Sequence, residues 1–273
     1  MSETNHVIVI GAGAAGMLAA IAAAREGAAV ELWEQNEKPG KKLFITGKGR
    51  CNVTNACDME ELLGSVVSNS KFLYSSFYGF TNQDMMDLLE QAGLRLKVER
   101  GNRVFPQSDK SSDVISALSA LLRQTGVRVC LNQKAEGLAV EEGVCKGVRC
   151  GGRIQTADRV IVATGGLSYP ATGSTGDGLK WAADSGHRLT ELSPALVPFE
   201  VKETETVKEL QGLSLKNIEA VVMRGKKVIY REFGEMLFTH YGVSGPVLLS
   251  ASSYAVKELK KGPLSLVIDL KPA

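Results

Sequence analysis

The segment HVIVIGAGAAG, residues 6–16, decides the fold of this chain. His6–Ile10 is a short apolar run typical of a buried parallel strand, and it leads directly into a G-x-G-x-x-G spacing. Ala14–Glu26 predicts a helix, because Gly27 supplies the usual helix stop. Ala29–Trp33 predicts a second strand. The sequence therefore predicts a βαβ unit with a glycine-rich first turn.

Each glycine of this turn has a separate physical role. Gly11 permits the tight turn, Gly13 lets the backbone approach a pyrophosphate, and Gly16 lets the helix pack closely on the strand. The N-terminus of the helix offers free N–H groups to phosphates. Glu34 follows the second strand, where a carboxylate accepts hydrogen bonds from a ribose diol and repels a 2′-phosphate. These features predict a site for FAD or NAD and disfavour NADP there.

Bulk composition is that of an ordinary globular protein. The chain has 273 residues, of which 44% are hydrophobic and 23% charged, enough for one large or two modest domains. The net charge is +2, without the basic stripe that nucleic-acid binders usually carry. We therefore expect a small-molecule substrate and no nucleic-acid partner.

An uncharged run, Val7–Ala24, raises the alternative of a signal peptide or membrane span. The preceding residues are not basic, and the run is rich in glycine and alanine, so a segment of a soluble protein is favoured. The five cysteines are odd in number and follow no secretory signal. We therefore expect a cytoplasmic protein that does not interact with membranes.

The later strands separate FAD from NAD. Arg159–Gly166 predicts a buried strand that ends in Ala163-Thr164-Gly165. NAD dehydrogenases usually continue with repeated βα units, whereas this arrangement resembles the FAD domain of two-dinucleotide-binding-domain flavoproteins. The strand is preceded by four stretches that predict short antiparallel strands: Val127–Leu131, Ala135–Val140, Val144–Val148 and Arg153–Thr156.

Four separated motifs carry a family resemblance over essentially the whole chain. The chain resembles the BaiN/YhiN-like flavoproteins, the aminoacetone-oxidase-type FAD-binding family. The motifs are GKK with TGxGRCNxTN in residues 40–55, RVFP with SDK in residues 103–110, ATGGxSYP with TGSTGDG in residues 163–178, and LFTHYGVSGP in residues 237–246.

The resemblance implies an α/β fold, a Rossmann-type FAD-binding domain with a partial β-rich inserted domain. We expect residues 1–191 to form the FAD-binding domain and residues 192–273 the inserted, substrate-side domain. Family members return from the inserted domain to contact the flavin, and no such stretch precedes Ala273. We therefore expect a chain truncated at its C-terminus.

The polar stretch Thr46–Asn52 is implied by the resemblance to line the flavin side of the site. Gly47 and Gly49 free backbone N–H groups, Arg50 can balance phosphate or reduced-flavin charge, and Asn52 can hydrogen-bond the flavin. A polar surface turn is the alternative. The predicted cofactor-binding residues are Gly11, Ala12, Gly13, Ala14, Ala15, Gly16, Glu34, Gln35, Lys42, Thr46, Gly47, Gly49, Arg50, Cys51, Asn52, Ala135, Ala163, Thr164, Gly165, Gly166 and Asp177.

Cysteine and histidine chemistry is less defined. Disulfide reductases carry a CxxxxC pair at a comparable place, but five residues separate Cys51 from Cys57. Two interpretations of these cysteines therefore stay open: Cys51 is a thiol packed near the flavin, or Cys51 and Cys57 form a redox disulfide. The pair has no zinc-like spacing, and we expect no metal. His240 is either an acid–base group or a packed loop histidine.

These features together predict an FAD-dependent oxidoreductase that transfers hydride to or from flavin N5 on an unidentified small organic substrate. NADH or NADPH is the candidate electron donor. The resemblance leaves an enone reductase and an amine-oxidase-like activity open. The alternatives are a truncated, non-catalytic FAD-fold protein and a disulfide oxidoreductase.

Overall fold

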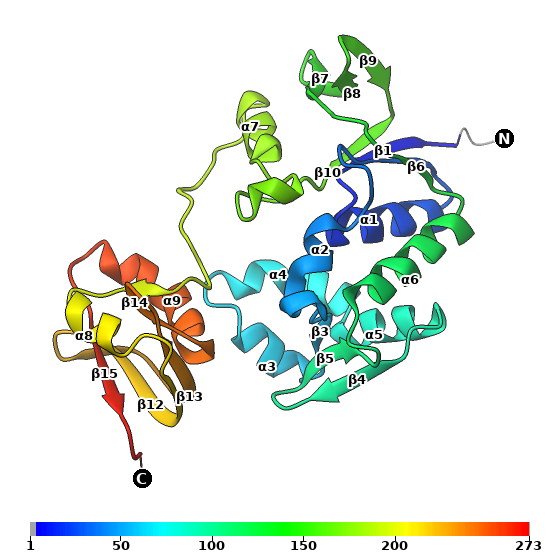
Figure 1. Ribbon diagram of the computed structural model, residues 1–273. Coiled ribbons are helices and arrows are strands. Elements are labelled where there is room, and N and C mark those ends of the chain that lie inside the picture. Colours follow the sequence, from blue (N-terminus) through cyan, green and yellow to red (C-terminus); the bar gives the residue numbers. More distant parts are fainter. Residues whose placement is uncertain (1–3, 273) are drawn as a thin grey trace. The chain divides into compact units, whose positions relative to one another are not determined.

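The computed structural model describes residues 4–272. The chain divides into two compact units, Met1–Leu189 and Thr190–Ala273, and Figure 1 shows the elements of each.

A four-stranded parallel sheet forms the centre of the first unit. Its order is β10 (Arg159–Val162), β1 (His6–Ile10), β2 (Ala29–Trp33) and β6 (Arg128–Cys130). The helix α1 (Ala14–Arg25) connects β1 to β2, as predicted. Because β1 lies between β2 and the much later β10, the strand order reverses beside β1. Such a switch point opens a crevice at the carboxyl ends of the strands, where α/β proteins bind ligands.

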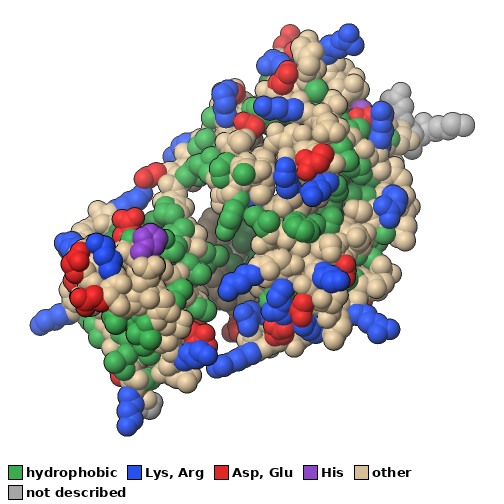
Figure 2. Space-filling view, viewed as in Figure 1, with side chains coloured by type: hydrophobic (Ala, Val, Ile, Leu, Met, Phe, Trp, Pro, Cys, Tyr) green, Lys and Arg blue, Asp and Glu red, His purple; other side chains and the backbone are tan. Residues whose placement is uncertain are grey.

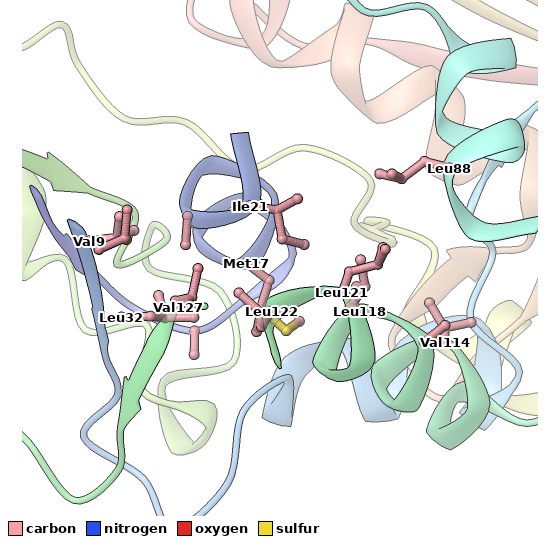
Figure 3. Packing of buried hydrophobic residues seen from close by; sticks show 14 of the residues in the cluster. Val9, Met17, Ile21, Leu32, Leu88, Val114, Leu118, Leu121, Leu122 and Val127 are labelled. Carbon is pink, nitrogen blue, oxygen red and sulfur yellow. The ribbon is translucent and has the colours of Figure 1, made fainter. Parts of the chain in front are cut away.

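The main core of this unit lies between α1, the sheet and α6 (Ser111–Gln124). Met17 and Ile21 of α1 lie close to Leu118 and Leu122 of α6 in Figure 3, and all four are essentially excluded from solvent. Each such side chain contributes about 1.5–3 kcal/mol when fully buried. This packing fixes the start of α1 relative to the sheet.

A long excursion connects β2 to α6. It begins with α2 (Lys41–Ile45) and the short 3₁₀ segment η1 (Thr46–Gly49). It then forms the small antiparallel sheet β3-β5-β4 and three helices between its strands. The elements are β3 (Thr54–Asn55), α3 (Met59–Gly64), α4 (Ser70–Gly79), α5 (Asn82–Gln91), β4 (Leu96–Glu99) and β5 (Arg103–Pro106).

The antiparallel meander predicted before β10 is present, and consists of β7 (Gly137–Glu141), β8 (Val144–Cys150) and β9 (Arg153–Thr156). The assignment of Val127–Leu131 to that group is wrong, because β6 pairs in parallel with β2. The strand β6 follows α6 directly in the chain and completes a crossover connection. After β10 come η2 (Pro170–Thr172) and α7 (Asp177–Asp184).

The second unit is a five-stranded antiparallel sheet in the order β11-β14-β13-β12-β15, packed against one long helix, α9 (Pro246–Leu259). Val247, Leu248 and Ala251 of this helix are buried. The other elements are β11 (Phe199–Glu200), α8 (Thr204–Glu209), β12 (Ser214–Arg224), β13 (Lys227–Phe238), β14 (Gly242–Ser244) and β15 (Ser265–Asp269).

None of the helices in residues 4–272 is both long and apolar enough to cross a membrane. Across the same residues, no three His, Cys, Asp or Glu side chains gather in a way that would hold a metal ion. Acidic and basic side chains are interspersed on the face shown in Figure 2.

Candidate cofactor site

A cavity of about 320 Å³ opens at the carboxyl ends of β1 and β2 in the first unit. This is the place that the strand order predicts for a ligand. The cavity is lined by Ile10, Gly11, Ala12, Gly13, Ala14, Ala15, Trp33, Glu34, Gln35, Lys41, Lys42, Leu43, Thr46, Gln133, Ala135, Ala163, Thr164, Gly165, Thr172, Gly173, Ser174, Asp177 and Trp181.

The glycine turn is closed on its protein side and open on its cavity side. Gly11 has φ +100°, and a Cβ there would lie 2.6 Å from the carbonyl oxygen of Ala163. A Cβ on Gly16 would lie 1.7 Å from the carbonyl oxygen of Gly11. A Cβ on Gly13, in contrast, would meet no atom within 4 Å. Gly11 and Gly16 are thus required by packing, and Gly13 leaves space for a ligand.

The N-terminus of α1 borders that space. Gly13 is its N-cap and provides no side-chain cap, and the first turn contains no acidic residue. Ala14 and Ala15 of this turn line the cavity. Uncapped N–H groups and the positive end of the helix dipole suit a pyrophosphate at this position.

Glu34, directly after β2, is 8% exposed and accepts hydrogen bonds from the residues around it. Its Oε2 accepts a hydrogen bond from the N–H of Ala12 at 2.9 Å. Its Oε1 accepts from the backbone N–H and the side-chain amide of Asn36, at 2.9 and 2.7 Å. A carboxylate has about four acceptor positions, so this one retains capacity for a ribose hydroxyl. The residues around the cavity therefore fit an ADP-containing dinucleotide.

Side chains from the first half of the unit hold the loop that follows β10. The Nζ of Lys42 donates to the carbonyl oxygen of Ser168 and to the Oγ of Ser174, each at 2.7 Å. The Nε2 of Gln35 donates to the carbonyl oxygen of Gly173 at 2.9 Å. These contacts fix one wall of the cavity.

Arg50 is directed to other charges rather than to the cavity. Its guanidinium forms ion pairs with Glu99 and Asp109 and lies 4.1 Å from the centre of the Phe105 ring. The hydrogen bonds that the guanidinium donates to Glu99 and then to Asp109 raise the pKa of Arg50. Within the predicted flavin stretch, Thr46 alone lines the cavity.

The neighbours of Arg50 also make their contacts outside the cavity lining. Cys51 is only 1% exposed and belongs to the main core of the unit. The side-chain amide of Asn52 is oriented with its nitrogen toward two carbonyl groups. This nitrogen donates to the carbonyl oxygens of Thr54 and Val104, at 3.0 and 3.2 Å. The stretch is anchored on the small β3-β5-β4 sheet, next to the cavity.

The cavity brings together most of the predicted residues. Predicted residues among its lining are Gly11, Ala12, Gly13, Ala14, Ala15, Glu34, Gln35, Lys42, Thr46, Ala135, Ala163, Thr164, Gly165 and Asp177. Predicted residues outside its lining are Gly16, Gly47, Gly49, Arg50, Cys51, Asn52 and Gly166. His240 lies in the second unit, exposed between β13 and β14, with its ring edge-to-face against Tyr241.

Several lining residues were missed from the sequence. Ser174 could have been predicted as a lining residue because it lies in the TGSTGDG motif. Trp33 could have been predicted because it ends the second strand, beside Glu34. Trp181 is both buried and part of the cavity wall. Gln133 had no local signal, because β6 brings it beside Glu34 through a parallel pairing.

The thiols do not form a disulfide in this structure. All five cysteines are free. Burial raises the pKa of the Cys51 thiol. Burial, followed by the nearby Glu61, raises the pKa of the Cys57 thiol. Neither environment promotes the thiolate that dithiol exchange requires.

The chain is similar to known flavoenzymes by fold. It matches a flavocytochrome c3 fumarate reductase at 24% identity with a TM-score of 0.54, over 79% of this chain and 47% of that one. It matches 3-ketosteroid delta1-dehydrogenase from Sterolibacterium denitrificans at 17% identity with a TM-score of 0.56, over 82% and 62% of the two chains. These matches support the predicted fold class.

Two relatives are similar in sequence. The 3-dehydro-bile acid delta(4,6)-reductase of Clostridium scindens is 34% identical, over 98% of this chain and 65% of the relative. The ribosomal RNA dihydrouridine synthase of Escherichia coli is 31% identical, over 92% and 61%. The chain thus spans less than two thirds of the length of either relative.

A family model settles the classification. The model described as the HI0933-like protein Rossmann domain matches residues 5–252. Together with the sheet order and the glycine turn, this match confirms the predicted Rossmann-type, FAD-binding fold class and the resemblance from which it was inferred. The chain belongs to the HI0933-like Rossmann-domain family.

Proposed function

We propose that this chain provides the FAD-binding part of an oxidoreductase that reduces a carbon–carbon double bond conjugated to a carbonyl group. The observation that carries the FAD assignment is the open space above Gly13, bordered by the uncapped start of α1 and by Glu34. The reaction class is supported by the names of the relatives.

The residues have distinct tasks in this proposal. The first turn of α1 binds the pyrophosphate, and Glu34 accepts hydrogen bonds from the adenosine ribose. Lys42 holds the wall formed by Ser168 and Ser174 in place. FAD, when bound, supplies the hydride chemistry at its isoalloxazine ring. The chain's own contribution is to bind and orient the cofactor.

The two relatives share one chemistry despite different substrates. A delta(4,6)-reductase acting on a 3-dehydro bile acid and a dihydrouridine synthase are both named for products of double-bond reduction. In an unsaturated 3-keto steroid and in a uracil ring, the double bond is conjugated to a carbonyl. Hydride adds to the carbon far from the carbonyl, and a proton adds to the carbon beside it. An enone-type acceptor is therefore favoured over an amine substrate.

The proposal also includes the substrate, the electron donor, the location and the division of the chain. We propose a small-molecule substrate, NADH or NADPH as electron donor, and a cytoplasmic location, which the free cysteines support. We propose residues 1–191 as the FAD-binding part and residues 192–273 as the substrate-side part. A uracil in ribosomal RNA is the second candidate substrate, favoured by the identity to the Escherichia coli relative.

A reoxidation experiment tests the function. The FAD-loaded protein is photoreduced without oxygen and mixed with a 4-en-3-one steroid or with a uridine-containing ribosomal RNA fragment. We expect the enone to restore the oxidised flavin spectrum and to yield the saturated ketone. Reoxidation by the RNA fragment, with dihydrouridine as product, would identify the second candidate. Bound FAD that neither acceptor reoxidises would contradict the proposed reaction class.

A further inference from the structure

A second groove lies between α2 and α6, on the surface of the first unit. It has a volume of about 360 Å³. Its polar lining consists of Lys38, Lys41 and Arg123, with the hydroxyl groups of Ser112, Ser116 and Ser119. The serines and Arg123 follow one face of α6 at helical spacing. The groove therefore presents three cations and three hydroxyl groups, from α6, from the start of α2 and from the segment before α2.

The cations of this groove are not neutralised from within it. No acidic residue is among the lining residues that the structure describes. Lys41 lies 3.5 Å from Glu37, which is exposed. Lys38 and Arg123 take part in none of the ion pairs found within residues 4–272. The nearest acid on α6 is Asp113, which accepts a hydrogen bond from the hydroxyl of Ser112 at 3.3 Å. The groove thus has excess positive charge.

The two elements that form the groove are firmly joined. The Oγ of Ser111 donates to the carbonyl oxygen of Phe44 at 2.7 Å. The side chain of Ile115 packs so closely on Gly40 that a Cβ there would lie 2.9 Å from it. Lys38 lies 5.6 Å from the centre of the Phe44 ring. The geometry of the groove is therefore fixed before any ligand arrives.

We propose that this groove binds a phosphate group of a soluble ligand. Lysine and arginine side chains flanked by serine hydroxyls provide the charge-assisted donors that recognise phosphate. Lys41 lines both this groove and the cofactor cavity, so the two sites share the wall formed by α2. Given the proposed function, the ligand is the phosphorylated electron donor, and the groove recognises the 2′-phosphate that distinguishes NADPH from NADH.

Calorimetric titration, without oxygen, of protein saturated with photoreduced FAD tests the proposal. The cofactor then blocks phosphate binding at Gly13, and a reduced flavin accepts no hydride from the dinucleotides that are titrated. The probes are inorganic pyrophosphate, NADPH and NADH. We expect pyrophosphate to bind, and NADPH to bind at least about tenfold more tightly than NADH. The double variant Lys38→Glu/Arg123→Glu should lose pyrophosphate binding and the preference for NADPH.

A matched control makes the same charge change elsewhere in the unit. Lys146→Glu/Arg153→Glu alters two exposed cations of the β7-β8-β9 meander, and it should leave all three titrations unchanged. If the groove variant loses its fold, the milder Lys38→Gln/Arg123→Gln takes its place. The FAD content of each protein is measured separately, so a failure of the cofactor assignment remains distinguishable.

Two results would overturn the inference. Absence of pyrophosphate binding, or binding that is equally strong in the groove variant, would show that the groove does not recognise phosphate. Pyrophosphate binding without any preference for NADPH would contradict the assignment of the groove to the electron donor. Displacement of pyrophosphate by an RNA fragment but not by NADPH would also contradict it, and would point to the nucleic-acid substrate.

Discussion

The Nε of Arg50 lies 2.7 Å from the Oδ1 of Asp109, although 59 residues separate them in sequence. Lys97 lies 2.7 Å from the other oxygen of the same carboxylate, and Glu99 pairs with both cations. This network of four charges attaches the end of the Thr46–Asn52 stretch to the small β3-β5-β4 sheet. Since Thr46 lines the cofactor cavity, we infer that the network positions one wall of the site.

This network predicts an acid dependence of FAD retention. Hydrogen bonds from Lys97, then from Arg50, lower the pKa of Asp109, and a hydrogen bond from Arg50 is the main cause that lowers the pKa of Glu99. Both folded values lie below the unfolded values of 3.8 and 4.5. The stabilisation is therefore complete above about pH 4.5 and is lost as the pH falls through the folded values.

The variant Asp109→Asn tests this dependence. It should release FAD faster than the natural protein at neutral pH and should show a weaker increase in release as the pH is lowered. The control Asp184→Asn removes an exposed carboxylate that pairs with Lys180 on α7, and it should behave like the natural protein. FAD release is followed by the rise in flavin fluorescence. Identical pH profiles for Asp109→Asn and the natural protein would contradict a positioning role.

Glu34 should matter for both folding and cofactor binding. Glu34→Ala leaves the backbone N–H groups of Ala12 and Asn36 without their acceptor, while the side-chain amide of Asn36 keeps the carbonyl oxygen of Thr172. Each unsatisfied buried group costs about 1–3 kcal/mol. We expect a lower free energy of unfolding without FAD and weaker FAD binding. Glu34→Gln should restore much of the stability but not the affinity. Denaturant unfolding and FAD titration separate the effects, and an unchanged affinity in both variants would remove Glu34 from the site.

The cysteines should be dispensable as a redox pair. Because the pKa of each thiol is raised by burial, we expect slow alkylation of Cys51 and Cys57 at neutral pH. Cys57→Ser should retain bound FAD and the anaerobic reduction of the flavin. A loss of reduction in Cys57→Ser with FAD still bound, accompanied by loss of a two-thiol step in reductive titration, would support the disulfide oxidoreductase alternative.

Local features made the first half of the site predictable. The strand at His6–Ile10, the turn at Gly11 and the strand at Ala29–Trp33 each follow from residues adjacent in sequence, and the structure has them where predicted. Contacts between residues far apart in sequence could not be predicted in this way. The sequence indicated that Arg50 is a cation, but the structure was needed to find its partners 49 and 59 residues away. The parallel pairing of β6 was missed for the same reason, since a short edge strand carries no distinctive pattern.

The central claim is that the space above Gly13 holds the pyrophosphate of FAD, and FAD retention by Gly13→Val tests it most directly. Gly64→Val is the matched control, because a Cβ at Gly64, in α3, also meets no atom within 4 Å. Protein saturated with FAD is passed through gel filtration, and the flavin absorbance of the protein peak is recorded together with its thermal unfolding.

We predict that the natural protein and Gly64→Val retain FAD. Gly13→Val should unfold at a similar temperature without the cofactor but bind FAD at least about a hundredfold more weakly, a loss of about 2.8 kcal/mol. Full FAD retention by a folded Gly13→Val would contradict the account.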